Sequence, residues 1–207
     1  MLAMNAGMIN VLGLISLLHQ SVSHMTGNAS LIALSLADQD YSSVIFLVLV
    51  VISYVLGSSY SGFILGNSHF QLGRRYGLPL TLVTIFILLC WLFISEYPRY
   101  ALLWACASMG IQNAMVSHYQ GAIIRTTHLS GVLTDLGLAL GYFFRGLKND
   151  PKKIILHLLI LIGFITGSIV AAISYPYLQF YFFFIPAGLS FLLSLIYWIL
   201  YLRHSRS

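Results

Sequence analysis

The sequence predicts an all-α polytopic membrane protein with six transmembrane helices and two short re-entrant (broken) half-helices, arranged as two inverted repeats of three spans each. Three observations lead to this prediction: an apolar composition, long apolar runs and an internal duplication. Hydrophobic residues make up 59% of the chain and charged residues only 7%, whereas soluble globular domains carry about 25% charged residues. Because so few charges cannot cover a soluble globule, we expect the chain to lie in a lipid bilayer.

The predicted spans are the long apolar runs of the chain. A spanning helix needs roughly 17–25 apolar residues, and six runs reach this length: residues 2–18, 43–66, 78–95, 100–118, 154–174 and 180–202. Two shorter runs, 29–37 and 132–144, are predicted to be half-helices, since at about 1.5 Å per residue the first covers only about half of the ~30 Å hydrocarbon layer. The segments before them, 19–25 and 119–129, are polar, β-branched or glycine-rich and are predicted to be extended chain.

The duplication is visible in three matched blocks that occur in the same order. Residues 23–28 read Ser-His-Met-Thr-Gly-Asn and residues 127–132 read Thr-His-Leu-Ser-Gly-Val. The other pairs of blocks are 7–10 with 110–113 and 62–66 with 163–167. Duplicated halves are a common way to build membrane transporters. We therefore expect a single integral membrane domain, 1–207, with repeat halves 1–97 and 98–207.

The charges in the gaps between runs predict the topology. Most basic residues lie in gaps that do not contain Asp38, Asp40 or Glu96. These basic residues are Arg74, Arg75, Arg145, Lys148, Lys152, Lys153, Arg203 and Arg206. If the two short runs dip in and return, all these basic residues fall on one side, which the positive-inside rule makes cytoplasmic, together with both termini. Three spans per half then make the halves inverted. Eight crossings with parallel halves are the alternative.

The candidate binding site is formed by the predicted starts of the two half-helices. Thr26 and Ser130 are expected to cap the helices through their hydroxyls, and Gly27 and Gly131 let backbone or ligand approach closely. Asn28 follows in the first block. Two helix N-termini that converge near mid-bilayer would form an electropositive pocket for a small anionic or polar solute. Alternatively, the caps satisfy the helix ends and nothing binds.

Four ionisable side chains in and beside the two half-helices are functional candidates, because ionisable residues at membrane depth usually have a function. Arg125 and Asp135 either form a structural ion pair or contribute to substrate or proton binding. His24 and His128 occupy equivalent places in the two halves. They either carry protons, because histidine titrates near neutral pH, or fill space as hydrogen-bonded side chains.

Three amides, Asn10, Gln112 and Asn113, are expected to line the same cavity or to hydrogen-bond the halves together. Two glycine pairs, Gly62/Gly66 and Gly163/Gly167, predict close packing between helices. We expect neither an enzyme nor a cofactor or metal, since the chain lacks a phosphate-binding glycine loop with lysine, HExxH and GxSxG. The net charge of +5 sits mainly in short gaps and therefore indicates orientation, so no nucleic-acid partner is expected.

Several blocks also carry a family resemblance. They are Ala6-Gly7 with Asn10, Met25-Thr26-Gly27-Asn28, residues 110–114 (Gly-Ile-Gln-Asn-Ala) and residues 125–136 (Arg-Thr-Thr-His-Leu-Ser-Gly-Val-Leu-Thr-Asp-Leu). Over essentially the whole chain, the sequence resembles the YoaK-like family of multi-pass bacterial membrane proteins, a domain-of-unknown-function group. That family usually carries an aspartate where Asn10 stands, so a possible proton-coupling acid is absent here, and a threonine where Ser130 stands.

The resemblance implies a multi-pass protein of the bacterial inner (cytoplasmic) membrane and leaves its activity open. A looser similarity to the core of sulfate-permease and uracil-permease transporters is an analogy of fold only. Two hypotheses remain. One is a small secondary transporter or channel whose partners are the lipid bilayer and a small-molecule solute. The other is a non-transporting sensor or assembly partner, and a homo-oligomer is possible in either case.

Overall fold

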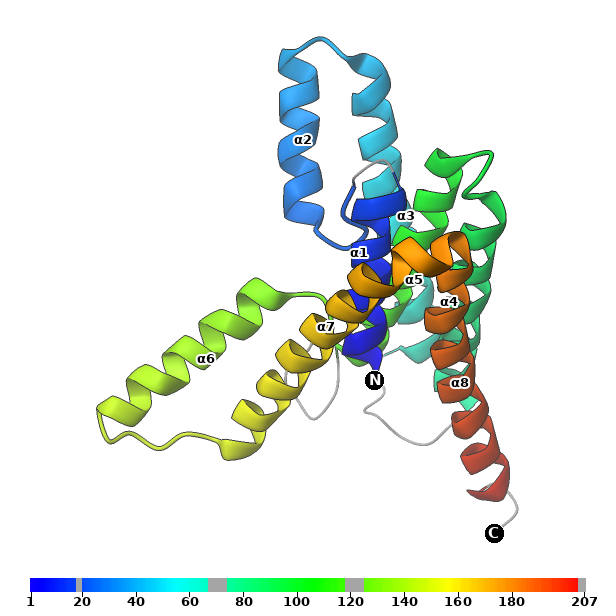
Figure 1. The fold of residues 1–207 in the computed structure, drawn as a ribbon. Helices are drawn as coiled ribbons and strands as arrows, with labels where there is room; N and C mark the ends of the chain where they lie inside the picture. The colour runs from blue at the N-terminus through cyan, green and yellow to red at the C-terminus, as the bar shows by residue number, and fades with distance from the viewer. Residues whose placement is uncertain (18–19, 67–73, 118–124, 205–207) are drawn as a thin grey trace.

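The computed structural model describes residues 1–17, 20–66, 74–117 and 125–204. These residues contain helices and no strand, which confirms the predicted all-α class (Figure 1). The helices are α1 (Leu2–Ser16), α2 (Met25–Ala37), α3 (Tyr41–Leu65), α4 (Arg74–Phe93), α5 (Pro98–Val116), α6 (Leu129–Phe144), α7 (Pro151–Leu178), the short 3-10 helix η2 (Gln179–Phe183) and α8 (Phe184–His204). The predictions for residues 18–19, 118–124 and Arg206 lie outside the described residues.

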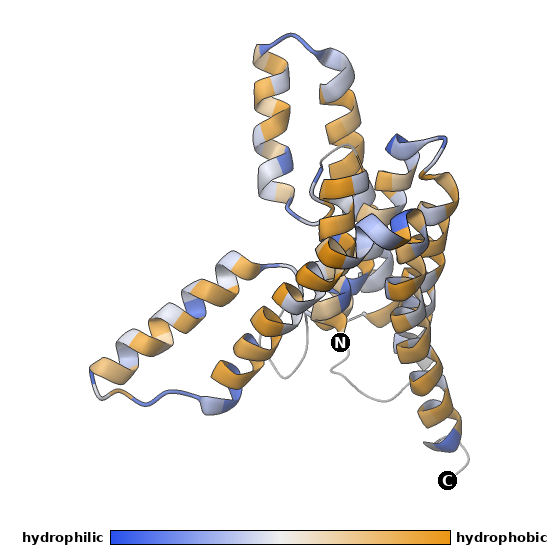
Figure 2. Ribbon diagram, viewed as in Figure 1, coloured by the Kyte–Doolittle hydropathy of each residue, from blue (hydrophilic) through white to orange (hydrophobic). Residues whose placement is uncertain are grey.

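Three stretches are long and apolar enough to cross a membrane. They are Tyr41–Leu65 in α3, Tyr76–Phe93 in α4 and Pro151–Arg203, which contains α7, η2 and α8. Helices α1, α2 and α6 are apolar but shorter. Figure 2 shows apolar residues along most of the helices and hydrophilic residues gathered at several turns. The described residues thus form helices of which three stretches are candidates to span a membrane, and the count of six crossings stays a prediction.

Local sequence explains where several helices begin and end. The carboxylate of Asp40 accepts the backbone N–H of Ser43 at 3.1 Å and caps α3. At the start of α7, the carboxylate of Asp150 accepts the N–H of Lys152 at 3.0 Å. Gly66 ends α3 with a φ of 58°, a conformation that is costly for residues with a side chain. These polar and glycine positions separate the apolar runs into helices.

Helix α5 lies at the centre of the packed body. Most of its residues between Ala101 and Met115 are buried. Helices α3 and α4 pack on α5, α4 also packs on α8, and α1 runs along α7. The core side chains include Met8, Ile9 and Met109. The body therefore interleaves the two halves of the chain, because α1 contacts α7 and α3 contacts α5.

The interface between α1 and α7 depends on two glycines. A Cβ atom at Gly7 would collide with the carbonyl of Phe164, and a Cβ atom at Gly167 would collide with the carbonyl of Met4. The hydroxyl of Ser168 donates to the carbonyl of Gly7 at 3.4 Å. In a membrane, helix association relies on such close backbone packing because lipid tails are as apolar as the side chains.

The interface between α3 and α5 has the same construction. A Cβ atom at Gly110 would collide with the carbonyl of Tyr54, and a Cβ atom at Gly57 would collide with the carbonyl of Ala107. The hydroxyl of Ser58 donates to the carbonyl of Gly110 at 3.1 Å. Each half therefore contributes a first helix and a third helix to two matched interfaces.

These contacts correct one half of the glycine prediction. Gly167 lies in a close interface, and Gly163 lies in ordinary contact with Ala3, as predicted. For Gly62 and Gly66 the prediction is wrong, since no described atom lies within 4 Å of a Cβ built at either position. The glycine of the first half that packs as Gly167 does is Gly57, whose neighbour Ser58 matches Ser168.

The short helices α2 and α6 lie outside the packed body. Helix α2 packs on α3, and α6 packs on α7. Each buries a single side chain, Asn28 in α2 and Val132 in α6. Figure 1 shows that each begins beside the body and points away from it. Both begin earlier than predicted, at Met25 and Leu129, and this changes the roles of the residues at their starts.

Candidate functional site

The predicted caps of the short helices are wrong. His24 and His128 are the N-cap residues, and neither forms a side-chain capping bond. Thr26 and Ser130 lie inside the first turn, where their carbonyls accept the hydroxyls of the residues four positions later, at 3.2 Å and 2.9 Å respectively. The prediction followed the residue types that favour N-caps, but each helix begins one residue before the expected cap.

The glycines of the first turns make room for the histidines. A Cβ atom at Gly27 would lie 3.1 Å from Nδ1 of His24, and a Cβ atom at Gly131 would collide with the ring of His128. Both imidazoles thus lie against the N-terminal turn of a short helix, and both residues are exposed. The duplicated His-x-x-Gly spacing has the same structural role in both halves.

Asn10 and Asn28 hold the segment before α2. The Asn10 Oδ1 atom accepts the hydroxyls of Ser21 at 2.7 Å and Ser23 at 3.0 Å. The buried Asn28 donates from Nδ2 to the carbonyl of Ser21 at 3.3 Å. These two predicted site residues therefore connect α1, the segment and α2.

Asn113 holds the segment before α6 in a similar way. Its Nδ2 atom donates to the Thr127 hydroxyl at 2.6 Å and to the Tyr54 hydroxyl at 2.8 Å. Its Oδ1 atom accepts the Thr126 hydroxyl at 2.9 Å. Asn10 and Asn113 thus perform equivalent tasks, each binding the hydroxyl residue that precedes an N-cap histidine.

Gln112 is the centre of a buried network. Its Oε1 atom accepts Nδ2 of Asn5 at 3.1 Å, and its Nε2 atom donates to the carbonyl of Leu2 at 3.0 Å and to the Thr126 hydroxyl at 2.9 Å. Asn5 also donates to the hydroxyl of Ser190 on α8 at 3.0 Å. We name Asn5, Gln112, Asn113, Thr126 and Ser190 the central amide network. All five are buried, and the network joins both halves. For Gln112 and Asn113 this is the second of the two expected roles, since neither lines the cavity described next.

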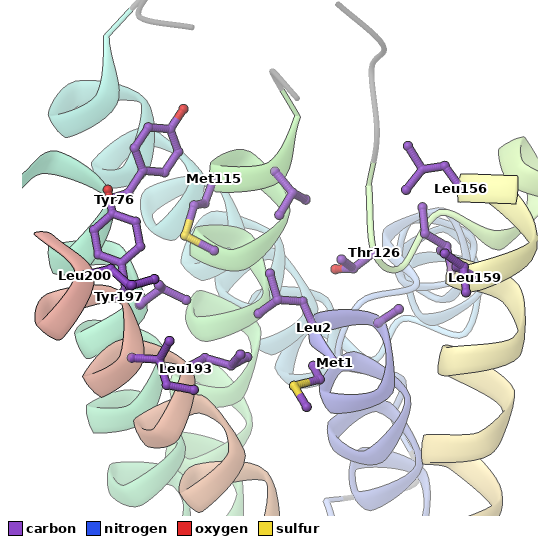
Figure 3. Close-up of a pocket in the computed structure, with 15 residues that line it drawn as sticks. Met1, Leu2, Tyr76, Met115, Thr126, Leu156, Leu159, Leu193, Tyr197 and Leu200 are labelled. Atoms are coloured by element: carbon purple, nitrogen blue, oxygen red, sulfur yellow. The ribbon is translucent and has the colours of Figure 1, made fainter. Parts of the chain in front are cut away.

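A cavity of about 440 Å³ lies beside the central amide network. It is bounded by the first residues of α1, the start of α4, the ends of α5 and α8 and the start of α7. Figure 3 shows Tyr76 and Tyr197 on one side of this space and Leu156 on the other, with Thr126 between them. Thr126 is the network member that lines the cavity, whereas Gly27 and Gly131 do not line it. We name this space the central cavity.

Comparison with known proteins identifies the family. The model of the family described as "Protein of unknown function (DUF1275)" matches residues 1–196. The chain belongs to the DUF1275 family. It is also 25% identical over 199 residues to the UPF0700 transmembrane protein YoaK of Bacillus subtilis (strain 168), a match that covers 92% of this chain and 88% of YoaK. No solved structure matches significantly. The predicted resemblance to a YoaK-like membrane family of unknown function is therefore confirmed.

The ionisable residues of this DUF1275 protein pair differently from the structural alternative considered above. Asp135 lies 3.4 Å from Nε2 of His157 on α7, with 44% of the Asp135 side chain and 7% of the His157 side chain exposed. Arg125 is exposed and forms no ion pair with Asp135 among the described residues. The structure therefore has no Arg125–Asp135 bridge. Asp135 lies in the second turn of α6 and contacts His157 on α7 instead.

Four buried polar residues of these sites were not candidates in the sequence analysis: Asn5, Thr126, His157 and Ser190. Asn5, His157 and Ser190 lie in the first, fifth and sixth apolar runs. A polar side chain inside an apolar run is the signal that could have found these three, because such residues are costly in a membrane. Thr126 lies before the second short helix, where a polar residue gives no such signal. The Oδ1 atom of Asn5 accepts no hydrogen bond from a described residue. Among the described residues, no group of three or more His, Cys, Asp or Glu side chains could hold a metal ion.

Proposed function

We propose that this DUF1275 protein is a small secondary transporter or permease that binds a small polar solute in the central cavity. One observation carries the proposal: the Thr126 hydroxyl belongs to the buried network and also lines the cavity. Ligand sites combine mostly apolar walls with a few placed polar groups. Polar side chains at membrane depth are costly and are typical of solute pathways.

Matched contacts support an arrangement of two inverted repeats. The α1–α7 and α3–α5 interfaces use equivalent glycine and serine contacts, and Asn10 and Asn113 bind equivalent hydroxyls. The first helix of each half, α1 or α5, packs on the third helix of the other half, α7 or α3. A pseudo-two-fold axis between the halves would produce this exchange of partners. Inverted repeats of this kind place the substrate site at the repeat interface, where the central cavity lies.

The proposed location is the bacterial inner membrane, with both termini in the cytoplasm. The basic turn between α6 and α7 and the acidic turn between α2 and α3 lie toward different ends of the view in Figure 1. The positive-inside rule assigns the basic end to the cytoplasm. In this orientation the central cavity lies in the cytoplasmic half, because the starts of α1, α4 and α7 bound it. The described conformation is then the inward-facing state.

The walls of the cavity narrow the class of solute. Nearly all lining side chains are apolar or aromatic, and Arg125 does not line it. A solute with a hydrogen-bonding group and an apolar portion fits such walls better than the small anion that two converging helix N-termini would bind. The Thr126 hydroxyl donates to Asn113 and accepts from Gln112, so it can accept one further hydrogen bond from a donor group of the solute, while Leu2 and Leu156 face the apolar portion.

A thermal-shift screen of the purified protein against polar metabolites tests this function. A ligand at 100 times its dissociation constant stabilises by about 2.7 kcal/mol. A stabilising solute should lose its effect in Thr126→Val, which removes the hydroxyl. It should keep its effect in Thr84→Val, a matched variant of a buried threonine of α4 that does not line the cavity. Equal responses in both variants would exclude Thr126 as part of the binding site. A separate measurement, uptake of the stabilising solute into proteoliposomes, distinguishes transport from binding alone.

A non-transporting assembly partner is the second candidate. It is favoured by the exposure of α2 and α6, which each bury one residue and leave large apolar side chains such as Leu34 and Phe143 uncovered. In that case the surfaces of α2 and α6 bind another protein or a second copy. Cross-linking in native membranes from cysteines placed at these two positions distinguishes this role, since a protein surrounded by lipid gives no cross-linked product.

A further inference from the structure

A second, smaller hollow lies between α6 and α7, apart from the central cavity. Its volume is about 240 Å³. Its polar and charged lining residues are Asp135, Tyr142, Lys148, Asn149, Asp150, Lys153 and His157. None of these residues lines the central cavity. We name this space the α6–α7 hollow.

The charges around the α6–α7 hollow are unevenly paired. Asp150 accepts the backbone N–H of Lys152, and Asp135 lies against His157. Lys148 and Lys153 are exposed and form no ion pair with any described residue. The hollow is thus lined by two lysines and two aspartates. Because neither ammonium group is held in an ion pair by a described carboxylate, both are free to bind an anion at the rim of the hollow.

The turn that carries Lys148 is held in place. The neighbouring side chain of Asn149 donates from Nδ2 to the carbonyl of Ala139 on α6 at 2.7 Å. Gly146 has a φ of 68° and lets the chain reverse directly after α6. Because this bond fixes the turn against α6, Lys148 and Lys153 border the same hollow before any ligand arrives.

We propose that the α6–α7 hollow binds a phosphate group, and that an anionic phospholipid of the surrounding membrane supplies it. Large apolar side chains are exposed next to the lysines, among them Phe144, Leu147 and Ile155. They offer a surface for acyl chains directly beside the charged hollow. Basic pockets between transmembrane helices are a known kind of headgroup site. The inference goes beyond the proposed function and does not depend on transport.

The test uses the full chain purified in a neutral detergent. Its thermal unfolding is measured with added phosphatidylglycerol, phosphatidylcholine or inorganic phosphate. We expect phosphatidylglycerol to raise the unfolding temperature and phosphatidylcholine to have much less effect. Stabilisation by inorganic phosphate alone, at the concentration of the lipid phosphate, would support the phosphate site but reject the lipid as its source.

Variants locate the effect. Lys148→Gln combined with Lys153→Gln should weaken phosphatidylglycerol binding by roughly 25-fold, since each lysine near an anionic lipid contributes about fivefold in affinity. Lys152→Gln is the matched control, because Lys152 lies on the same turn of α7 but does not line the hollow. Native mass spectrometry counts the lipids that each variant retains. An equal loss in Lys152→Gln, or no preference for phosphatidylglycerol in the unmodified chain, would overturn the proposal.

Discussion

The glycines of the two matched interfaces allow a sharp test of the fold. In Gly7→Ala and Gly110→Ala, the new Cβ atom would collide with a backbone carbonyl of the facing helix, which cannot move aside as a flexible side chain can. Overpacking of this kind costs about 1–3 kcal/mol. In Gly62→Ala no described atom lies within 4 Å of the new Cβ, so the better helix propensity of alanine should stabilise by up to about 1 kcal/mol.

The free energies of unfolding of the two kinds of variant should therefore differ by roughly 1–4 kcal/mol. For a chain of about this size, 1 kcal/mol shifts the unfolding temperature by roughly 2–4 °C, so the expected separation is roughly 2–16 °C. Thermal unfolding in detergent, followed by circular dichroism, measures it. Gly7→Ala and Gly110→Ala should also resemble each other, because their interfaces have the same construction. Unfolding temperatures of both equal to that of Gly62→Ala would refute the packing described for α1–α7 and α3–α5.

Three further predictions follow from the polar contacts. Asp135→Asn and His157→Gln should each lower the free energy of unfolding. Because the Asp135 side chain is 44% exposed, the coupling energy measured with the double variant should be only about 0.5–1 kcal/mol. Strictly additive effects of the two substitutions would show that the two side chains do not interact. Thr127→Val should cost about 1 kcal/mol in thermal unfolding because it removes the bond to the amide of α5, and an unchanged unfolding temperature would contradict that bond. A cysteine at Asp38 should react with a membrane-impermeant thiol reagent in intact cells while one at Lys148 should not; the native cysteines are buried, and the reverse pattern would invert the proposed orientation.

The apolar runs placed most helices correctly because continuous apolar sequence leaves few alternatives in a membrane. The predicted runs 43–66, 78–95 and 100–118 correspond to α3, α4 and α5, with ends shifted by a few residues. The run 154–174 extends to Leu178 in α7, past Pro176. The run 180–202 divides into η2 and α8, since apolar character does not distinguish a 3-10 turn of aromatic residues from an α-helix.

The contacts between helices were less predictable. Gly62 and Gly66 match Gly163 and Gly167 in spacing, but spacing does not say which face of a helix meets a neighbour. Packing selects Gly57 instead, through the carbonyl of Ala107. Similarly, Asn5 and Gln112 meet only because α1 crosses α5, a long-range arrangement that no local pattern encodes.

The two halves share a frame but differ where the central cavity lies. The matched blocks place Ile9 opposite Gln112, and Val22 and Thr126 are the residues directly before the second pair of blocks. Ile9 and Val22 are buried among apolar side chains, whereas Gln112 and Thr126 hydrogen-bond to each other at 2.9 Å. Apolar residues fill these positions in the first half, so the helix packing that the two halves share does not require a polar pair at the equivalent positions of the second half. The polar pair adds a buried hydroxyl at the wall of a cavity, and this difference between otherwise equivalent positions adds support to the proposal that a solute is recognised at Thr126 rather than at the duplicated starts of the short helices.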